Sequence, residues 1–588
     1  MEQGLIAHRA NGSDCYALDE DRLVISIRTG YDVDRVEIEY GDPFQSGIMG
    51  GNEKWSGTRQ DITECVRLSS QKLWSIVVEP RFHRCKYFFV LHDKEEVLYY
   101  FEDGCFCEEQ LNIPGRVEQC FFFPWMNPSD INRVPEWVED TIWYQIFPER
   151  FCNGNPALSP EGVKPWKCRR VGLLDFYGGD LQGIIDKLPY LKDLGINGIY
   201  LNPVFASDSN HKYNTTDYTR IDPHFGSEET MKELVQKAHE NGIRIMIDAV
   251  FNHSGTKFAP WMDVVEKGPE SEYFDWFFVH QWPIPTRGRD TRDGRFDSFA
   301  FTTMMPKINT NHPDVVDYFR KICVHWVDDW GIDGIRFDVG NEVSHSFLRT
   351  LRSELKARRS QIYLMGEIWH DSLSWLMGDE YDAVMNYPFS QSIHNFFADE
   401  SLSARDLEYS INRCYHMYMK QTNRVLFNLL DSHDTIRLYT RLGENIEKFY
   451  QHMVLLFTMQ GSPCIYYGTE LAMPGSFDPD CRRCMPWKEI EAGKYDLPIQ
   501  RMKQLIAMRK ENPGCRAEAI HWIEEQEARL IHYIKTDGQQ QIEVYLNATG
   551  EAQRIPIVGN ILFSVGCKVD EPAEQGMIGV NGSIVLCR

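Results

Sequence analysis

The chain has 588 residues, more than one ordinary domain, and 43% of them are hydrophobic, which allows large cores and excludes a disordered protein. Its 86 acidic residues outnumber the 62 basic ones, and the net charge of −24 argues against nucleic acid and anionic membranes as partners. A neutral partner is compatible with this charge. The 13% aromatic content suits sugar-binding surfaces, although large cores and protein interfaces use aromatic residues as well.

The sequence predicts a cytoplasmic protein. Residues 1–4 carry no basic segment followed by an apolar one, so we expect no signal peptide. No apolar run approaches the roughly 20 residues of a membrane span. The 16 cysteines are scattered, which is typical of reduced thiols. Residues 481–484 read Cys-Arg-Arg-Cys, half of a zinc or redox site, but no second pair follows at ligand spacing and we expect no metal there.

Residues 1–125 are predicted to form a β-sandwich. Apolar or alternating runs at 23–28, 36–40, 73–78 and 87–91 are separated by clusters of Asp, Gly and Pro, as in short antiparallel strands. No catalytic arrangement is evident in this part. It serves binding or assembly, or it only stabilises the rest of the chain.

Residues 126–511 are predicted to form an α/β fold, a (β/α)8 TIM barrel. After a linker that ends near Pro135, apolar strands alternate with longer helical stretches, as in parallel sheets. The eight candidate strands are residues 141–147, 198–202, 244–250, 334–339, 362–368, 383–387, 424–430 and 463–467. The interval from 252 to about 310 is long and irregular, so we expect a small excursion over the strand ends.

Residues 512–588 return to short strands and predict a C-terminal β-sandwich domain. The candidate strands are 520–522, 531–534, 542–545 and 555–557. Pro556 lies in the last of them, and because proline cannot donate a ladder hydrogen bond, that strand is an edge strand at best.

Polar residues gather where four of the predicted barrel strands end. They are Asp248, Asn252 and His253 on the third strand, Arg336 and Asp338 on the fourth, Glu367 and Trp369 on the fifth, and His433 and Asp434 on the seventh. Each alone is compatible with a structural role, and an Arg–Asp pair can simply tie a barrel together. The C-terminal ends of barrel strands meet at one mouth, so the four groups together favour a catalytic centre.

Carboxylates without an evident metal cage or thiol nucleophile suit glycoside hydrolysis. One carboxylate attacks the sugar carbon, and a second, which keeps its proton, donates it to the leaving oxygen. The charge of Arg336 favours an ionised Asp338, whereas Ile368 and Trp369 give Glu367 an apolar setting that favours its protonated form.

Four further motifs occur in the order of a known family: Trp-Tyr-Gln-Ile-Phe-Pro-Glu-Arg-Phe at 143–151, Met-Pro-Lys-Ile-Asn at 305–309, Asn-Glu at 341–342 and Asp-Pro-Asp-Cys-Arg-Arg at 478–483. With the strand-end residues, they resemble the α-amylase family of glycoside hydrolases, family 13. Within it, the sequence looks like the neopullulanase, cyclomaltodextrinase and maltogenic amylase group. The resemblance covers nearly the whole chain, and residues 1–125 resemble the starch-binding-type module of that group.

The resemblance implies a role for each site residue. Asp338 is the expected nucleophile, Glu367 the general acid/base, and Asp434 the third carboxylate, which grips the sugar hydroxyls. In the substrate pocket, Arg336 is expected to orient Asp338, and His253 and His433 are expected to hydrogen-bond the sugar. Tyr213 is expected to stack on the same sugar, and Asp248 and Asn252 to support the pocket. Further expected contacts are Trp369, Phe301 and Arg437. For Phe301 a packing role in its loop is an equal alternative.

The group often binds calcium in a loop after the first strand. In this chain the matching loop, residues 153–159, lacks two of the carboxylates and carries a leucine, whereas calcium prefers six to eight oxygens, several of them charged. The remaining candidate ligands are Asn153, Asn155, Gly178 and Asp180. We therefore expect that no cofactor is required and keep calcium as a candidate.

Two other positions depart from the group's pattern. Gly340 replaces a usual Ala and is expected to loosen the turn beneath the nucleophile, since glycine is conformationally permissive. Thr469 replaces a common Asp. Neither change removes a catalytic group.

The resemblance implies a retaining enzyme that cleaves α-1,4 bonds in cyclodextrins, maltooligosaccharides and pullulan, with transfer to sugar acceptors. It also implies a homodimer formed through the N-terminal module, which narrows the partner's active site. Two alternatives stay open: a chain-end α-glucosidase of the same family, and a catalytically silent glucan-binding protein on the same scaffold.

Overall fold

The computed structural model describes residues 1–45, 55–166, 171–285, 290–570 and 574–588. It forms two compact units, which are described separately. One contains Met1–Arg133, Asp371–Asp379 and Ser392–Asn423, and the other contains Val134–His370, Glu380–Gln391 and Arg424–Arg588.

The N-terminal part of the first unit is a β-sandwich, as predicted. One sheet has the order β1 (Cys15–Ala17), β2 (Leu23–Thr29), β6 (Lys72–Val78) and β5 (Glu64–Arg67). The other has the order β4 (Thr58–Asp61), β3 (Arg35–Gly41), β7 (Cys85–His92), β8 (Val97–Phe101) and β9 (Gly104–Phe106), with β10 (Phe121–Phe123) paired to β7. Alternating residues such as Ile25, Ile27 and Phe89 form the core between the sheets, because side chains two apart share a face.

Helical segments far along the chain complete this unit. Helix α9 (Ala404–Tyr415) carries Glu408, whose carboxylate accepts hydrogen bonds of 3.0 and 2.7 Å from the guanidinium of Arg67. Met419 packs with Tyr16 on β1. Residues 392–423, which the sequence pattern places in the barrel domain, belong to the same compact unit as the sandwich, and the burial of Met419 with Tyr16 and Val24 is one cause.

The second unit is built on a parallel eight-stranded barrel, as predicted. Its strand order is β18 (Ala383–Val384), β17 (Tyr363–Gly366), β16 (Gly334–Phe337), β15 (Arg244–Ala249), β12 (Gly198–Leu201), β11 (Trp143–Ile146), β20 (Ser462–Tyr466) and β19 (Phe427–Asn428). A parallel bridge between Met385 and Phe427 joins the first strand of this order to the last and closes the ring. Because both faces are buried, these strands are mostly apolar, which is why the sequence pattern found them.

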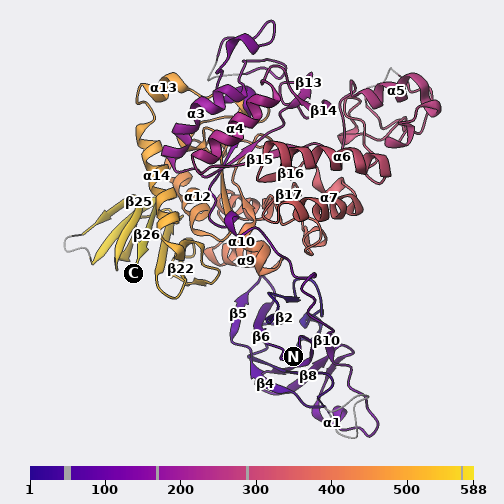
Figure 1. The fold of residues 1–588 in the computed structure, drawn as a ribbon. Coiled ribbons are helices and arrows are strands. Elements are labelled where there is room, and N and C mark those ends of the chain that lie inside the picture. The colour runs from indigo at the N-terminus through magenta and orange to yellow at the C-terminus, as the bar shows by residue number, and fades with distance from the viewer. Residues whose placement is uncertain (46–54, 167–170, 286–289, 571–573) are drawn as a thin grey trace. The chain divides into compact units, whose positions relative to one another are not determined.

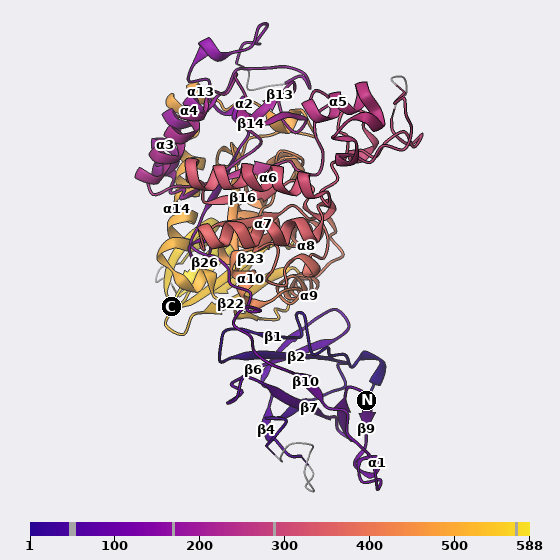
Figure 2. The same ribbon diagram turned by 45° about the vertical axis from the view of Figure 1, so that its right-hand side comes forward.

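Helices cover the outside of the barrel, and Figures 1 and 2 show α6 and α7 side by side against β16 and β17. The principal helices of the second unit are α3 (Leu181–Leu194), α4 (Glu228–Glu240), α6 (Pro313–His325), α7 (His345–Arg358), α8 (Tyr387–Ala398, shared with the first unit), α12 (Ile446–Thr458) and α14 (Asp496–Glu511). Helix α4 illustrates why these segments form helices that pack on the barrel. Ser227 caps its first turn, and Met231, Leu234 and Val235 form its buried stripe at helical spacing.

Two loops at the strand ends carry structure of their own. After β15 comes the predicted excursion, with α5 (Ala259–Lys267) and short bridges such as His253–Lys307, over a small core that includes Trp261 and Phe277. After β12 comes an antiparallel pair that the sequence did not reveal, β13 (Phe205–Ser207) and β14 (Thr215–Ile221).

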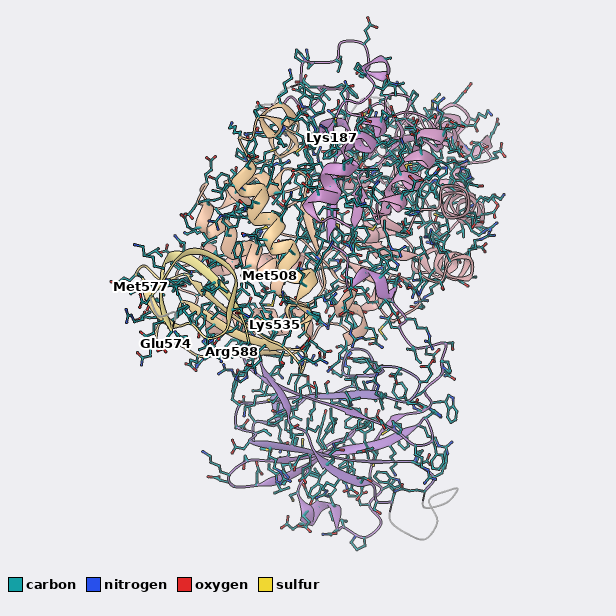
Figure 3. The ribbon with its side chains drawn as sticks, turned by 60° about the vertical axis from the view of Figure 1, so that its left-hand side comes forward. Lys187, Met508, Lys535, Glu574, Met577 and Arg588 are labelled. Carbon is teal, nitrogen blue, oxygen red and sulfur yellow. The ribbon has the colours of Figure 1, made fainter. Side chains whose placement is uncertain are left out.

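The C-terminal strands form one antiparallel sheet where a sandwich was predicted. Its order is β21 (Ile520–Trp522), β22 (Leu530–Thr536), β23 (Gln541–Asn547), β26 (Gln575–Cys587) and β24 (Gln553–Pro556), and β25 (Asn560–Val569) pairs with β26. Strand β24, which ends at Pro556, lies at an edge, as predicted. Figure 3 marks Lys535 on this sheet and Met508 on the neighbouring helix α14. The buried ammonium of Lys535 donates to the carbonyls of Thr458, at 2.7 Å, and Cys515, at 3.0 Å.

Among the described helices, none combines the length and the apolar character needed to cross a membrane.

Candidate active site

Three neighbouring strands carry the centre of the site. Parallel pairing places Asp248 on β15 opposite Arg336 on β16. The Asp338 N–H donates to the main-chain carbonyl of Ala249 at 3.1 Å, and the Glu367 N–H donates to the carbonyl of Phe337 at 3.0 Å. Main-chain hydrogen bonds of the sheet therefore hold the three acidic residues at adjacent strand ends.

One buried guanidinium joins three carboxylates. Arg336 Nη1 lies 2.8 and 2.9 Å from the two oxygens of Asp248 and 2.8 Å from Asp338 Oδ1. Its Nη2 lies 2.9 Å from Glu367 Oε2. Burial raises the pKa of Asp338 well above its usual value and the charge of Glu367 adds to this, while Arg336 opposes it. Burial also raises the pKa of Asp248 against the pull of Arg336.

The turn after the nucleophile candidate is strained. Val339 has a φ of 47°, a left-handed conformation that β-branched residues rarely adopt. This conformation directs its N–H to Glu367 Oε2, at 2.9 Å, so the turn links the two catalytic candidates.

The expected loosening at Gly340 is wrong. Gly340 does not have a left-handed backbone, and its N–H donates to the Glu367 carbonyl at 3.0 Å. Its carbonyl accepts a hydrogen bond from Tyr381 Oη, also at 3.0 Å. The glycine is needed for close packing and not for backbone flexibility, because a Cβ there would lie 2.9 Å from that hydroxyl.

Asp434 lies at the same mouth, next to His433. Its carboxylate contacts His433 Nε2 at 2.9 Å and Arg482 Nη2 at 3.1 Å. Desolvation opposes ionisation of Asp434, but the charges of His433 and Arg482 outweigh it and lower the pKa of the carboxyl. Asp434 is therefore the carboxylate that stays ionised most readily.

Tyr213 connects the two parts of the site. Its hydroxyl lies 2.9 Å from Asp248 Oδ2 and 2.7 Å from His433 Nε2, and its ring stacks on the His433 ring with 5.3 Å between centroids. Asn202 donates to the same hydroxyl at 2.9 Å. The predicted residues around Arg336 and those around Asp434 thus form one hydrogen-bonded network.

Sequence reasoning missed several members of this network. Tyr200 donates to Asp248 at 2.7 Å, Gln145 contacts His433 Nδ1 at 2.8 Å, and Arg482 pairs with Asp434. The first two lie on barrel strands β12 and β11, where the pattern shows only that a side chain is buried. Arg482 lies in a motif that had been noted, but its partner is 48 residues away.

Trp369 and Phe301 are exposed, at 42% and 50%. The Trp369 ring stacks on Tyr387 and its Nε1 lies 3.3 Å from Glu367 Oε1, which places it at the acid/base candidate. Phe301 follows Ala300 in a loop where both residues have positive φ, and Arg292 covers its ring.

Arg437 has a different environment from the one predicted. It is fully buried, and its guanidinium donates to the main-chain carbonyls of Cys481 and Tyr467, both at 2.8 Å. A side chain with these partners holds two loops together, so a structural role replaces the predicted substrate contact.

The calcium candidates do not fit a calcium ion. Asp180, the single carboxylate among them, is the buried N-cap of α3 and accepts three main-chain hydrogen bonds, from Gly154, Asn155 and Gly183. The Asn155 side-chain oxygen accepts from Ala157. Among the four candidates, the oxygens that remain for an ion are the Asn153 side-chain oxygen and the Gly178 carbonyl, and both are uncharged. Calcium requires six to eight oxygens, several of them charged. Nowhere in the described ranges do three His, Cys, Asp or Glu side chains form a group that could hold a metal.

Glycoside hydrolases use a pair of carboxyl groups, and barrel enzymes place such groups at the C-terminal strand ends, so the site is that of a glycoside hydrolase. Residues 145–526 match the family described as alpha amylase, catalytic domain, and residues 1–127 match the alpha amylase N-terminal ig-like domain. The chain belongs to the α-amylase family.

Several named relatives align with most of the chain. The chain is 43% identical to a cyclomaltodextrinase of Geobacillus thermopakistaniensis, over 95% of this chain and 93% of the relative. It is 41% identical to an intracellular maltogenic amylase of Bacillus subtilis, over 95% and 93%. A solved structure of a cyclomaltodextrinase superposes with a TM-score of 0.88, at 36% identity, over 100% of this chain and 98% of that one.

Proposed function

We propose that the protein is a retaining α-glucan hydrolase that cleaves α-1,4 bonds in cyclomaltodextrins and maltooligosaccharides, accepts pullulan, and transfers glycosyl groups to sugar acceptors. The observation that carries this proposal is the contact of Asp338 and Glu367 with the two terminal nitrogens of one guanidinium, that of Arg336. Retaining enzymes need the two carboxyl groups close together, about 5–5.5 Å apart. Relatives of this chain bear the names of such enzymes.

The reaction then has two steps. Glu367 gives its proton to the glycosidic oxygen while an oxygen of Asp338 attacks the anomeric carbon, so the leaving sugar departs and a glycosyl ester forms on Asp338. Glu367, now ionised, takes a proton from water or from a sugar hydroxyl, whose oxygen attacks the same carbon and releases Asp338. Water gives hydrolysis and a sugar gives transglycosylation.

The charges around Arg336 support this division of roles. Three ionised carboxylates around one guanidinium repel each other, so a proton kept by one of them lowers the energy. Nη1 is shared by Asp248 and Asp338, whereas Glu367 contacts Nη2. In this proposal Glu367 acts as the general acid, and the contact with Arg336 Nη1 favours the ionised Asp338 that attacks. Asp434 lies ionised at the mouth, where it suits binding of the sugar hydroxyls.

The N-terminal sandwich has a role in substrate access in this proposal: it binds glucan or pairs two copies of the chain into a homodimer. Exposed aromatic rings of Phe44, Phe122 and Trp125 on this module, with Arg84 and Lys86 beside them, support a contact surface. We place the enzyme in the cytoplasm without nucleic-acid or membrane partners; the net charge and the name of the Bacillus subtilis relative support this. Light scattering after size-exclusion chromatography tests the dimer.

Product analysis tests the main proposal. The purified protein is incubated separately with β-cyclodextrin, pullulan and soluble starch. Fast opening of the cyclodextrin with maltose as main product supports it, and glucose as sole product from chain ends identifies an α-glucosidase. The variants Asp338→Asn and Glu367→Gln should each lose about a hundredfold to ten-thousandfold in kcat. Hydrolysis by both at the parent's rate would show that the site is elsewhere.

A further inference from the structure

Lys307 forms a contact that the reaction described above does not use. It lies in the Met305–Asn309 stretch, and its side chain is 19% exposed. Its ammonium donates to Asn252 Oδ1 and, at 2.9 Å, to the carbonyl of Glu342, with the Glu342 carboxylate 3.5 Å away. The ammonium thus connects the loop after β15 to the loop after β16.

The ammonium fixes which way the Asn252 amide points. An ammonium can only donate, so the Asn252 atom that faces it is the oxygen. The amide nitrogen, Nδ2, then lies 3.2 Å from His253 Nδ1. Since an amide nitrogen also only donates, His253 Nδ1 must accept, and the proton of the neutral ring lies on Nε2.

The resulting Nε2–H group is left for a ligand. The His253 ring is 1% exposed and stacks on Phe299, with 5.0 Å between centroids. Among the described residues, none makes a hydrogen bond of normal geometry with Nε2, and the main chain of Tyr213 is the acceptor that acts on the ring from nearby. Burial and then the charge of Lys307 lower the pKa of His253 to about 3, so the ring is neutral at physiological pH and the tautomer decides what Nε2 can do.

We propose that Lys307 is a positioning residue: it acts through the Asn252 amide to hold His253 as the Nε2–H tautomer, so that the ring offers a donor to a hydroxyl of the sugar at the cleavage point. The inference rests on the proposed function for its ligand, but the tautomer itself does not depend on turnover. Without the ammonium, the Asn252 amide can turn its oxygen to His253. The proton then moves to Nδ1, and Nε2 becomes an acceptor.

The tautomer can be measured directly by two-bond 1H–15N correlation spectra of protein labelled with 15N-histidine. The signal that disappears in His253→Gln belongs to His253. The parent should show an unprotonated Nδ1 and a protonated Nε2, and Lys307→Met should shift the ring toward the opposite tautomer. An Nδ1–H tautomer in the parent, or no change in Lys307→Met, overturns the proposal even if the protein has no activity on any glucan.

A double-mutant cycle separates this role from a merely structural one. Lys307→Met should lower kcat/KM for β-cyclodextrin by about tenfold to one hundredfold, the usual effect of losing one buried donor. In His253→Gln the new side-chain amide can donate to the sugar whichever way the Asn252 amide points. Adding Lys307→Met to this variant should therefore change kcat/KM by less than about twofold. Multiplicative effects in the double variant would show that Lys307 acts elsewhere. The exposed Lys321→Met is the matched control and should equal the parent.

Asn252→Asp provides a second test if Lys307→Met does not fold. This near-isosteric change gives His253 only acceptors, so Nδ1 must carry a proton, and Nε2 has one only in the imidazolium. The titratable groups that act on His253 are Lys307, His211 and the new carboxylate, and the last raises the pKa of the ring. Activity should therefore fall about tenfold as pH rises through that pKa. A pH profile that matches the parent's would overturn the proposal.

Discussion

Gly340→Ala should reduce both the stability and the activity of this enzyme. The added Cβ would lie 2.9 Å from Tyr381 Oη, 3.1 Å from the Glu367 nitrogen and 3.2 Å from the Gly366 Cα. All three distances are shorter than ordinary van der Waals contact, and two of the atoms are main chain. The phenol cannot withdraw freely, because its hydroxyl is bonded to the Gly340 carbonyl.

The size of the effect follows from overpacking. Extra methyl groups in a packed core cost about 1–3 kcal/mol, so the melting temperature should fall by a few degrees. The main chain at the strand end that carries Glu367 must also move by a few tenths of an ångström. Misplacement by about 1 Å can cost one hundredfold in rate, and we expect kcat to fall about tenfold. Calorimetry and the rate of β-cyclodextrin opening measure the two effects.

A second substitution tests the cause. Tyr381→Phe removes the hydroxyl that the new Cβ meets, at a cost of about 1 kcal/mol for its hydrogen bond. Gly340→Ala should therefore do less harm in a Tyr381→Phe background than in the parent, where the contact with the hydroxyl adds to the two main-chain contacts. If Gly340→Ala alone matched the parent in both stability and kcat, the close packing argued for this turn would be refuted.

Three further predictions address features outside the reaction itself. Because the oxygens of Asp180 and Asn155 accept main-chain hydrogen bonds, treatment with EDTA should change neither kcat nor the melting temperature, and restoration of lost activity by added calcium would contradict this. Burial lowers the pKa of Lys535 from its usual 10.5 to about 7, so between these pH values the unfolded chain binds more protons than the folded one. The parent's free energy of unfolding should therefore rise with pH in this range, by up to roughly 1.4 kcal/mol per pH unit. Lys535→Met should lack this slope, and equal slopes in both proteins would show that Lys535 does not cause it. Arg437→Met should lower the melting temperature and leave KM for β-cyclodextrin unchanged, since the side chain bonds only to the protein interior in the described contacts; a raised KM with unchanged stability would restore the predicted substrate contact.

The sequence predicted the parts of the fold that local patterns encode. The eight barrel strands are mostly apolar because both faces are buried, and Asp338 and Glu367 could be located because they follow two of these strands. The antiparallel pair after β12 was not predicted, since Thr215–Ile221 is only partly buried and carries charged residues.

Long-range partners could not be read from the sequence. Nothing near Arg437 in the chain indicates that its donors end on the Cys481 and Tyr467 carbonyls, and nothing near Tyr213 indicates His433. A polar residue after a strand has the same local signature whether it faces a ligand or supports a neighbour. Only the folded chain separates the two, through burial and the identity of each partner.

The barrel closes unevenly, and this has a mechanical consequence. Strands β18 and β19 are two residues long and meet through the single bridge between Met385 and Phe427, with the side chains of Asn386 and Asn428 bonded at 2.8 Å. On the other side of the ring, β15 and β16 share a continuous ladder. The ring therefore has a seam. In local opening of the barrel, β18 and β19 should separate first, while the strands that carry Asp248 and Asp338 keep their register.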